Sequence, residues 1–213
     1  MRDKIILFDL DGTLIDSTEA ILESFAVAFK TFGDAVPQEA LIKSEIGYPL
    51  DIMFAALGVP EDKVWDYVDA YKMHYREISC AKTVLLKDAK EAVILASRHA
   101  TLGVVTTKTA KYSIELLEHM GLMDYFAVLI GREDVKNPKP DPEPIQKALA
   151  KLPSDTTNIW MVGDTCMDMV AAKAANIGAI GVTCGYGTEE SLLQCTDNIY
   201  QNAFNAVQFI ANR

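Results

Sequence analysis

Residues 5–17 of the chain have the sequence IILFDLDGTLIDS. The apolar run at 5–8 is typical of a strand buried on both faces, and Gly12 lets the chain turn away after it. Asp9 and Asp11 therefore stand where the strand ends. Ligands of open α/β sheets bind outside the carboxyl ends of the strands, so the two carboxylates indicate a functional site. A turn-forming role would explain one aspartate more readily than two.

The composition limits the classes of protein to consider. The chain has 213 residues, which suits one core domain plus an inserted or appended module. Its net charge of −10 argues against nucleic acid as the main partner, because phosphate-backbone binders usually carry a basic patch. The charge does not exclude a small anionic substrate, since a metal ion and a lysine can make a local positive site. No apolar run approaches the ~20 residues of a membrane span.

The cysteines indicate neither zinc nor thioredoxin-type chemistry. Cys80, Cys166, Cys184 and Cys195 include no Cys-x-x-Cys pair. A redox-sensitive thiol is one interpretation of Cys166 in the acidic loop, but as a small loop residue it is expected to be inert. The N-terminus enters a short strand without the apolar stretch of a secretory signal, so we predict a cytoplasmic protein.

Short apolar segments bounded by turn residues predict the strands of one sheet. They lie at 5–8, 102–106, 127–131, 159–163 and 179–183, with a weaker one at 198–200. Helical patterns at 110–120, 142–151 and 167–176 separate the later strands, and Gly121 and Gly178 are expected at the helix ends. This alternation predicts a doubly wound parallel α/β sheet.

A long insert interrupts this alternation after the first strand. The connection to the next strand has about ninety residues, whereas a crossover needs at least ~10–12. Apolar residues at helical spacing within 25–32 and 64–75 predict an inserted α-helical domain over 17–83, leaving 1–16 and 84–213 as the α/β core. Asp16 followed by Glu19 predicts a capping box that starts its first helix. An insert rooted beside Asp9 and Asp11 can act as a lid.

Three further segments after predicted strands carry polar side chains suited to phosphoryl transfer. They are Thr106 and Thr107, Lys139 in a Pro-rich loop, and Asp164 with Asp168. Clustered carboxylates attract a hard divalent cation such as Mg²⁺. Threonine hydroxyls bind phosphate oxygens, and a lysine adds positive charge where negative charge develops.

The two N-terminal aspartates fit complementary roles in the same reaction. A carboxylate can act as a nucleophile and divide the reaction into two displacements. Asp11 is placed to protonate the leaving oxygen and then to deprotonate the attacking water.

Four motifs in order resemble those of the haloacid dehalogenase-like hydrolase superfamily. They are 9–14 (DLDGTL), Thr106 after the second strand, Lys139 in KPDP, and 163–168 (GDTCMD). The insert after the first motif looks like the small helical cap of the subgroup that holds phosphoglycolate phosphatases, pyrophosphatases and β-phosphoglucomutase. The resemblance implies an α/β catalytic core with a helical cap, and a Mg²⁺-dependent phosphatase acting on a small phosphorylated metabolite, with 2-phosphoglycolate as leading candidate.

The resemblance also implies a role for each matching residue. Asp9 would form an aspartyl phosphate, and Asp11 would be the general acid/base and lend its backbone carbonyl to Mg²⁺. Thr106, with the backbone amide of Thr107, would bind the phosphoryl group. Lys139 would hold Asp9 and the phosphate. Asp164 would ligate the metal, with Asp168 beside it; Tyr48 is the cap residue expected to face the substrate.

Several alternatives remain open from the sequence. A pyrophosphatase or a sugar-phosphate mutase would share these motifs, although no acid/base residue for a mutase can be identified in the insert. A phosphoacceptor or binding module is also an α/β domain with an acidic pocket. In such modules, however, the phosphoacceptor follows a middle strand and no large insert follows the first strand, whereas here Asp9 follows the first strand and the insert comes directly after it. Lys43 lacks the motif of a Schiff-base lysine. Oligomeric state cannot be inferred from the sequence.

Overall fold

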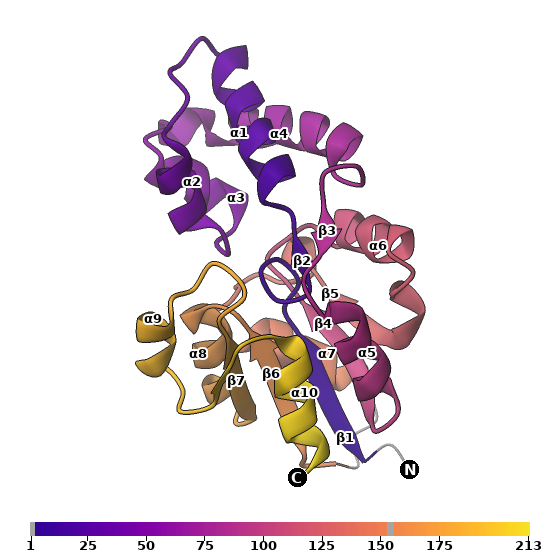
Figure 1. The fold of residues 1–213 in the computed structure, drawn as a ribbon. Coiled ribbons are helices and arrows are strands. Elements are labelled where there is room, and N and C mark those ends of the chain that lie inside the picture. The colour runs from indigo at the N-terminus through magenta and orange to yellow at the C-terminus, as the bar shows by residue number, and fades with distance from the viewer. Residues whose placement is uncertain (1–2, 153–155) are drawn as a thin grey trace. The chain divides into compact units, whose positions relative to one another are not determined.

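The computed structural model describes residues 3–152 and 156–213. The chain divides into two compact units, Met1–Asp16 with Leu85–Arg213, and Ser17–Val84. We call the second unit the insert. Figure 1 shows the course of the chain through both. Within the described residues, no helix combines the length and the apolar character needed to cross a membrane.

The elements of the first unit alternate between strands and helices through most of its length. They are β1 (Lys4–Phe8), β2 (Ile15–Asp16), α5 (Ala89–Ser97), β4 (Ala100–Val105), α6 (Ala110–His119), η2 (Met123–Tyr125), β5 (Phe126–Ile130), η3 (Arg132–Asp134), α7 (Glu143–Ala150), β6 (Ile159–Gly163), α8 (Cys166–Ala174), β7 (Gly178–Val182), α9 (Glu189–Leu193), β8 (Ile199–Tyr200) and α10 (Ala203–Ala211). The insert contains α1 (Thr18–Thr31), α2 (Glu39–Glu45), α3 (Leu50–Ala56), η1 (Glu61–Lys63) and α4 (Val64–Ile78), and β3 (Val84–Leu85) follows at the boundary.

One parallel sheet organises the first unit. Among the described residues it has six strands in the order β5-β4-β1-β6-β7-β8, and every adjacent pair is parallel. Phe8 lies in register with Val104 on one side and Val162 on the other, so the three central strands end at the same edge. The predicted α/β class with a parallel sheet and a helical insert is confirmed.

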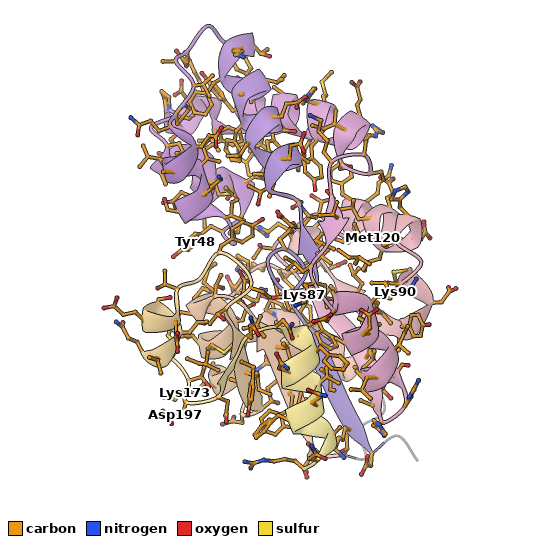
Figure 2. All side chains as sticks on the ribbon, viewed as in Figure 1. Tyr48, Lys87, Lys90, Met120, Lys173 and Asp197 are labelled. Carbon is orange, nitrogen blue, oxygen red and sulfur yellow. A yellow bond between two sulfur atoms is a disulfide. The ribbon has the colours of Figure 1, made fainter. Side chains whose placement is uncertain are left out.

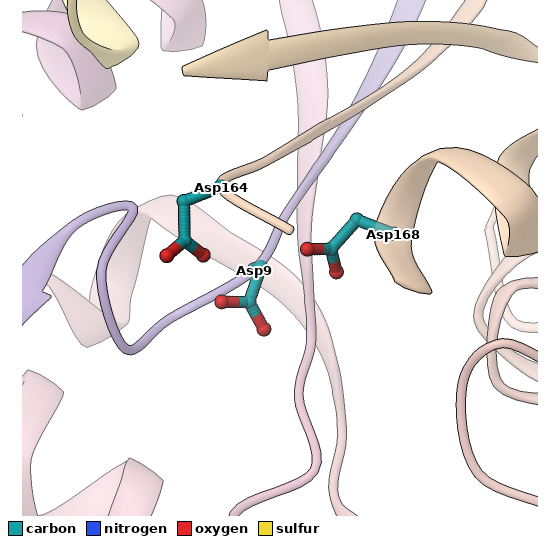
Figure 3. A group of neighbouring side chains, drawn as sticks. All are labelled: Asp9, Asp164 and Asp168. Carbon is teal, nitrogen blue, oxygen red and sulfur yellow. The ribbon is translucent and has the colours of Figure 1, made fainter. Parts of the chain in front are cut away.

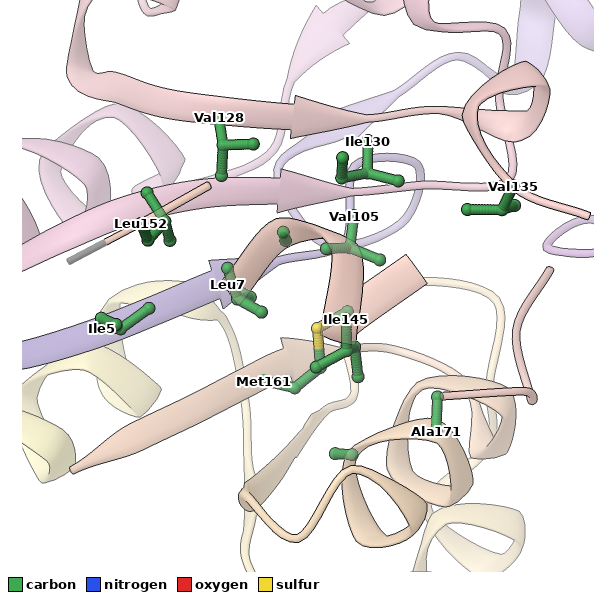
Figure 4. Packing of buried hydrophobic residues seen from close by; sticks show 12 residues of the cluster. Ile5, Leu7, Val105, Val128, Ile130, Val135, Ile145, Leu152, Met161 and Ala171 are labelled. Atoms are coloured by element: carbon green, nitrogen blue, oxygen red, sulfur yellow. The ribbon is translucent and has the colours of Figure 1, made fainter. Parts of the chain in front are cut away.

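Helices cover both faces of this sheet. Ile5 and Leu7 of β1 belong to a buried cluster that includes Ile145 of α7 and Ala171 of α8 (Figure 4). α5 packs against α10, and these helices contact β4 and β6–β8 respectively. Because β1 is buried on both faces, it has the continuous apolar sequence expected of a central parallel strand.

The insert has an aromatic core of its own. Phe25 of α1 lies 4.5 Å from Phe54 of α3 and 5.0 Å from Tyr71 of α4, measured between ring centroids. Phe29 and Tyr67 meet edge to face at 5.3 Å. Such pairs each contribute about 0.5–1.5 kcal/mol beyond the burial of their area. The helical spacing of aromatic residues in 25–32 and 64–75 is confirmed, and it marks the buried faces of α1 and α4.

Two local predictions at element ends were wrong. Asp16 does not cap the first helix of the insert: it lies in β2, which pairs with β3, and the N-cap of α1 is Ser17. Gly178 does not end α8, since it is the first residue of β7. Asn176 takes the left-handed conformation there, with φ 57°, because asparagine tolerates that region better than most residues. Gly121 does end α6, at φ 67°.

Candidate active site

Three buried carboxylates meet at the carboxyl edge of the central strands. Asp9 follows β1, Asp164 follows β6, and Asp168 lies in the first turn of α8. One carboxylate oxygen of each residue lies within 4.8 Å of the others. Figure 3 shows the three side chains as close neighbours. The register of β1 and β6 brings the first two together, because both strands end at the same level.

Lys139 neutralises part of this negative charge. Its Nζ donates to Asp9 Oδ1 at 2.6 Å, to Asp168 Oδ1 at 2.5 Å and to the Val105 carbonyl at 3.0 Å. Burial lowers the pKa of Lys139, but the negative charges of Asp168 and Asp9 outweigh burial and hold that pKa above its usual value. An ammonium group has three N–H donors, so all of them are used by these contacts.

The carboxylates nevertheless retain an excess of buried negative charge. Burial raises the pKa of Asp9 to about 7, against the charge of Lys139, which lowers it. Burial and the charges of Asp9 and Asp168 also raise the pKa of Asp164 well above its ordinary value. A divalent cation would compensate this charge, and an all-oxygen set of ligands suits a hard cation. The residues therefore fit a metal site.

Asp164 is held by residues for which the sequence predicted no role in the site. Its Oδ2 accepts from the Tyr186 amide at 2.7 Å, and its Oδ1 accepts from Thr13 Oγ1 at 3.3 Å. Gly12, at φ +83°, and Gly185 lie so close that a Cβ on either would stand 2.2 Å from Asp164 Oδ2. The only signal for the loop around Tyr186 was the pair of glycines that follows β7.

Asp168 has two functions in the fold. Its Oδ2 accepts from the amide and the hydroxyl of Thr165, at 3.1 and 2.8 Å, which makes the capping box of α8. Its Oδ1 contacts Lys139 and belongs to the carboxylate cluster. Asp168 thus caps α8 and also lies in the carboxylate cluster.

Asp11 lies outside the carboxylate cluster and pairs with a different lysine. Its Oδ2 is 3.2 Å from Lys108 Nζ, and the exposed fractions of the two side chains are 12% and 10%. The sequence predicted no role for Lys108. A lysine that follows Thr106 and Thr107 in a polar loop has no sequence signal that distinguishes it from a solvated one.

Thr106 is placed at the same edge, and Thr107 follows it. Thr106 is buried directly after β4, and its Oγ1 accepts from the Lys108 amide at 3.1 Å. Its own amide donates to the Ile130 carbonyl of β5 at 3.0 Å. Thr107 is half-buried. Tyr48, labelled in Figure 2, belongs to the insert between α2 and α3 and is 41% exposed.

A disulfide links two of the four cysteines, so the prediction that Cys166 is inert was wrong. Cys166, the first residue of α8, is bonded to Cys195, which follows α9, 29 residues later in the sequence. Cys80 and Cys184 are free. No short motif marks the pair, because the fold and not the sequence spacing brings the two residues together. In a reducing compartment the same residues would be thiols held side by side. The cytoplasmic location stays a prediction.

Reduction of this disulfide should destabilise the protein. A cross-link that closes a loop of this length stabilises the native state by about 2–4 kcal/mol, mainly by restricting the unfolded chain. We therefore expect dithiothreitol to lower the urea concentration at the midpoint of unfolding, by an amount that corresponds to this loss of free energy. The variant with both Cys166→Ser and Cys195→Ser is the control, since dithiothreitol should leave its midpoint unchanged. An equal midpoint for the wild type with and without reductant would contradict the expectation.

Comparison with known protein families gives one match over most of the chain. The model of a family described as haloacid dehalogenase-like hydrolase matches residues 6–182. This range includes all the aspartates of the site, Lys108 and Lys139, and the whole insert.

Individual relatives of the chain carry different names. A protein named "Probable phosphatase IndB" from Dickeya dadantii is 33% identical, with 95% of this chain and 91% of that protein covered. Pyrophosphatase PpaX from Bacillus pumilus is 34% identical over 89% of this chain and 87% of its own. Other relatives at 28–30% identity are named phosphoglycolate phosphatase. A crystal structure titled as a predicted phosphoglycolate phosphatase from Haemophilus somnus has a TM-score of 0.88, with 26% identity over 98% of both chains.

Proposed function

Since the chain belongs to the haloacid dehalogenase-like hydrolases, we propose that it is a Mg²⁺-dependent phosphatase that hydrolyses a small phosphomonoester, with 2-phosphoglycolate as the leading substrate. The observation that carries the proposal is the position of Asp9. Its carboxylate is buried at the end of β1, between a lysine and two further carboxylates, and Asp11 follows two residues later. This position supports a role as nucleophile for Asp9 and as acid/base group for Asp11, two residues on the same short segment.

Asp9 and Asp11 divide the chemistry between them. An oxygen of Asp9 attacks the phosphorus, the bond from phosphorus to the leaving oxygen breaks, and Asp11 gives its proton to that oxygen. Asp11 then takes a proton from a water molecule, whose oxygen attacks the phosphorus of the aspartyl phosphate. The bond from phosphorus to Asp9 breaks, which releases phosphate and restores the carboxylate.

The other residues hold the phosphoryl group and balance its charge. The Thr106 hydroxyl and the Thr107 amide would donate to phosphate oxygens, and Lys139 would keep Asp9 in place. Asp9, Asp164, Asp168 and the backbone carbonyl of Asp11 would hold Mg²⁺. The ion would neutralise the negative charge of the phosphoryl oxygens during transfer.

We assign catalysis to residues 1–16 and 84–213 and treat 17–83 as a cap that contributes to specificity through residues such as Tyr48. The division of the chain at Asp16 and Leu85 supports this assignment, because the aspartates of the site and both lysines lie in one unit. A lid needs to move as a unit, and the insert's own aromatic core suits that requirement.

A pyrophosphatase is the second candidate function. The observation that favours it is the 34% identity to PpaX from Bacillus pumilus. This identity is about as high as the 33% identity to IndB, so the chain resembles a pyrophosphatase as much as it resembles a phosphatase. Pyrophosphate and 2-phosphoglycolate would use the same nucleophile, since both present a phosphoryl group joined through oxygen to a leaving group.

A panel of substrates tests the proposal and separates the candidates. The purified protein is incubated with 2-phosphoglycolate, pyrophosphate and β-glucose 1-phosphate, and phosphate release is measured with Mg²⁺, with EDTA, and after Mg²⁺ is restored. We expect release that requires Mg²⁺ and is fastest with 2-phosphoglycolate. Faster release from pyrophosphate would favour the second candidate, and isomerisation of the sugar phosphate without release would identify a mutase. Absence of turnover with every substrate would overturn the proposal.

A further inference from the structure

Lys108 occupies a fixed position beside the proposed general acid/base. Its backbone amide donates to Thr106 Oγ1 at 3.1 Å, and its carbonyl accepts from the Arg132 amide at 3.0 Å. Its side chain is nine-tenths buried, and Nζ lies 3.2 Å from Asp11 Oδ2. The backbone of Lys108 is thus held at both its amide and its carbonyl, and the side chain is largely buried. The ammonium group therefore belongs to this edge of the sheet and is not a solvated surface charge.

This ammonium group is separate from the one that holds the nucleophile. Lys139 spends its three N–H donors on Asp9, Asp168 and the Val105 carbonyl. It therefore has no donor left for a second group of the substrate unless one of these contacts breaks. Among the ion pairs of the described residues, Lys108 supplies the other positive charge on an aspartate of the site.

The position of Asp11 determines what Lys108 can reach. A group that protonates the leaving oxygen must come within about 3 Å of it. Since Lys108 Nζ is 3.2 Å from Asp11 Oδ2, the ammonium lies within roughly 6 Å of that oxygen. The leaving group itself extends across the rest of this distance, so the ammonium group can keep its observed position. A negatively charged oxygen two or three bonds beyond the leaving oxygen would then contact Lys108.

We propose that Lys108 binds an anionic oxygen on the leaving group and so selects phosphate esters whose leaving group is itself negatively charged. The carboxylate of 2-phosphoglycolate and the second phosphate of pyrophosphate both supply such an oxyanion. This inference rests on the proposed phosphatase function, because it uses Asp11 as the group that contacts the leaving oxygen. It adds the class of leaving group and the residue that recognises it.

A matched pair of substrates measures this selection directly. 2-Phosphoglycolate and 2-hydroxyethyl phosphate have the same ester linkage, but only the first has a carboxylate on the leaving group. We expect wild-type kcat/KM to be at least about 10-fold higher for 2-phosphoglycolate, because a charge-assisted hydrogen bond changes binding by about 10- to 100-fold. In Lys108→Met this preference should fall to about one, mainly through a higher KM for the anionic substrate. Pyrophosphate is a third arm that shows whether a phosphate oxyanion is preferred over a carboxylate.

Two further variants make the result specific to the charge at this position. Lys108→Arg keeps the positive charge and should retain most of the preference. Lys90→Met removes an exposed lysine of α5, labelled in Figure 2, and should leave the preference at the wild-type value. If Lys108→Met does not fold, the wild-type preference and its retention in Lys108→Arg still test the proposal.

The outcomes distinguish this inference from the function on which it rests. If no phosphate is released from any of the three substrates, the phosphatase function is wrong. If the wild type hydrolyses 2-phosphoglycolate and 2-hydroxyethyl phosphate with equal efficiency, the function stands and the role of Lys108 is overturned. The role is also overturned if Lys108→Met lowers both efficiencies by the same factor, since a purely structural lysine would produce that result.

Discussion

Replacing Asp9 with asparagine should lower the turnover of 2-phosphoglycolate, and of a generic aryl phosphate, by at least about 10³-fold. Asparagine has nearly the size of aspartate and can still contact Lys139, but its amide oxygen is too weak a nucleophile to form the acyl phosphate. The effect should appear in kcat, because the substrate would still be bound by the surrounding residues. Phosphate release under single-turnover conditions measures it.

The control for Asp9→Asn is the same change at an exposed aspartate of the same unit. Asp124, in η2, is exposed and belongs to none of the site motifs, so Asp124→Asn should keep wild-type turnover. Circular dichroism should show both variants folded. A folded Asp9→Asn protein that keeps more than a tenth of wild-type kcat would show that Asp9 is not the nucleophile.

Replacing Lys139 with methionine should destabilise the fold as well as the reaction. The change leaves the buried carboxylates of Asp9 and Asp168 without their shared cation. Breaking a buried ion pair by removing one partner costs about 3–5 kcal/mol, because the remaining charge is uncompensated. We expect the free energy of unfolding to fall by this amount in the presence of a chelator. Urea unfolding followed by circular dichroism gives the value.

The pH dependence of this loss identifies its cause. In the folded protein the pKa of Asp9 is raised to about 7, whereas an unfolded aspartate has about 4. Protonation of Asp9 therefore stabilises the folded state as the pH falls from above 7 toward 4. Since a protonated Asp9 needs no cation, the loss caused by Lys139→Met should be smaller at pH 5 than at pH 8.

An exposed lysine of the same loop provides the matched control. Lys136→Met should change the free energy of unfolding by less than about 0.5 kcal/mol, because that side chain is exposed. The charge argument fails if Lys139→Met is no more destabilising than Lys136→Met, or if its loss is independent of pH.

The sequence predicted the sheet because five of its strands, β1 and β4–β7, are largely apolar runs of five or six residues between turn residues. The observed β1, β4, β5, β6 and β7 begin and end within two residues of the predicted segments. The helical insert was also predictable, since the aromatic residues of α1 and α4 repeat at the spacing of one buried helical face. In both cases burial imposes a periodicity that is visible in the sequence.

Features that depend on contacts between distant residues were not predictable. β2 and β3 have two residues each, too few for any periodicity. Because these two strands pair, Asp16 lies in a strand and not at the predicted helix cap. The disulfide of Cys166 and the ion pair of Lys108 with Asp11 join residues from separate parts of the chain. Amino-acid type alone does not distinguish such a residue from one in solvent. The motifs thus indicated Asp9, Asp11, Asp164 and Lys139 as candidate site residues. The residues that contact them could be identified only from the structure.

The insert leaves the sheet after β1 and returns before β4, through two short paired strands, and it folds around its own aromatic residues. Such a module can be exchanged by recombination without altering any strand of the parent sheet. An ancestor could thus acquire new substrates by replacing about seventy residues while inheriting its reaction unchanged. Lys108 lies outside the insert and would not be exchanged with it. A preference for charged leaving groups held by that lysine would therefore persist across descendants whose inserts differ.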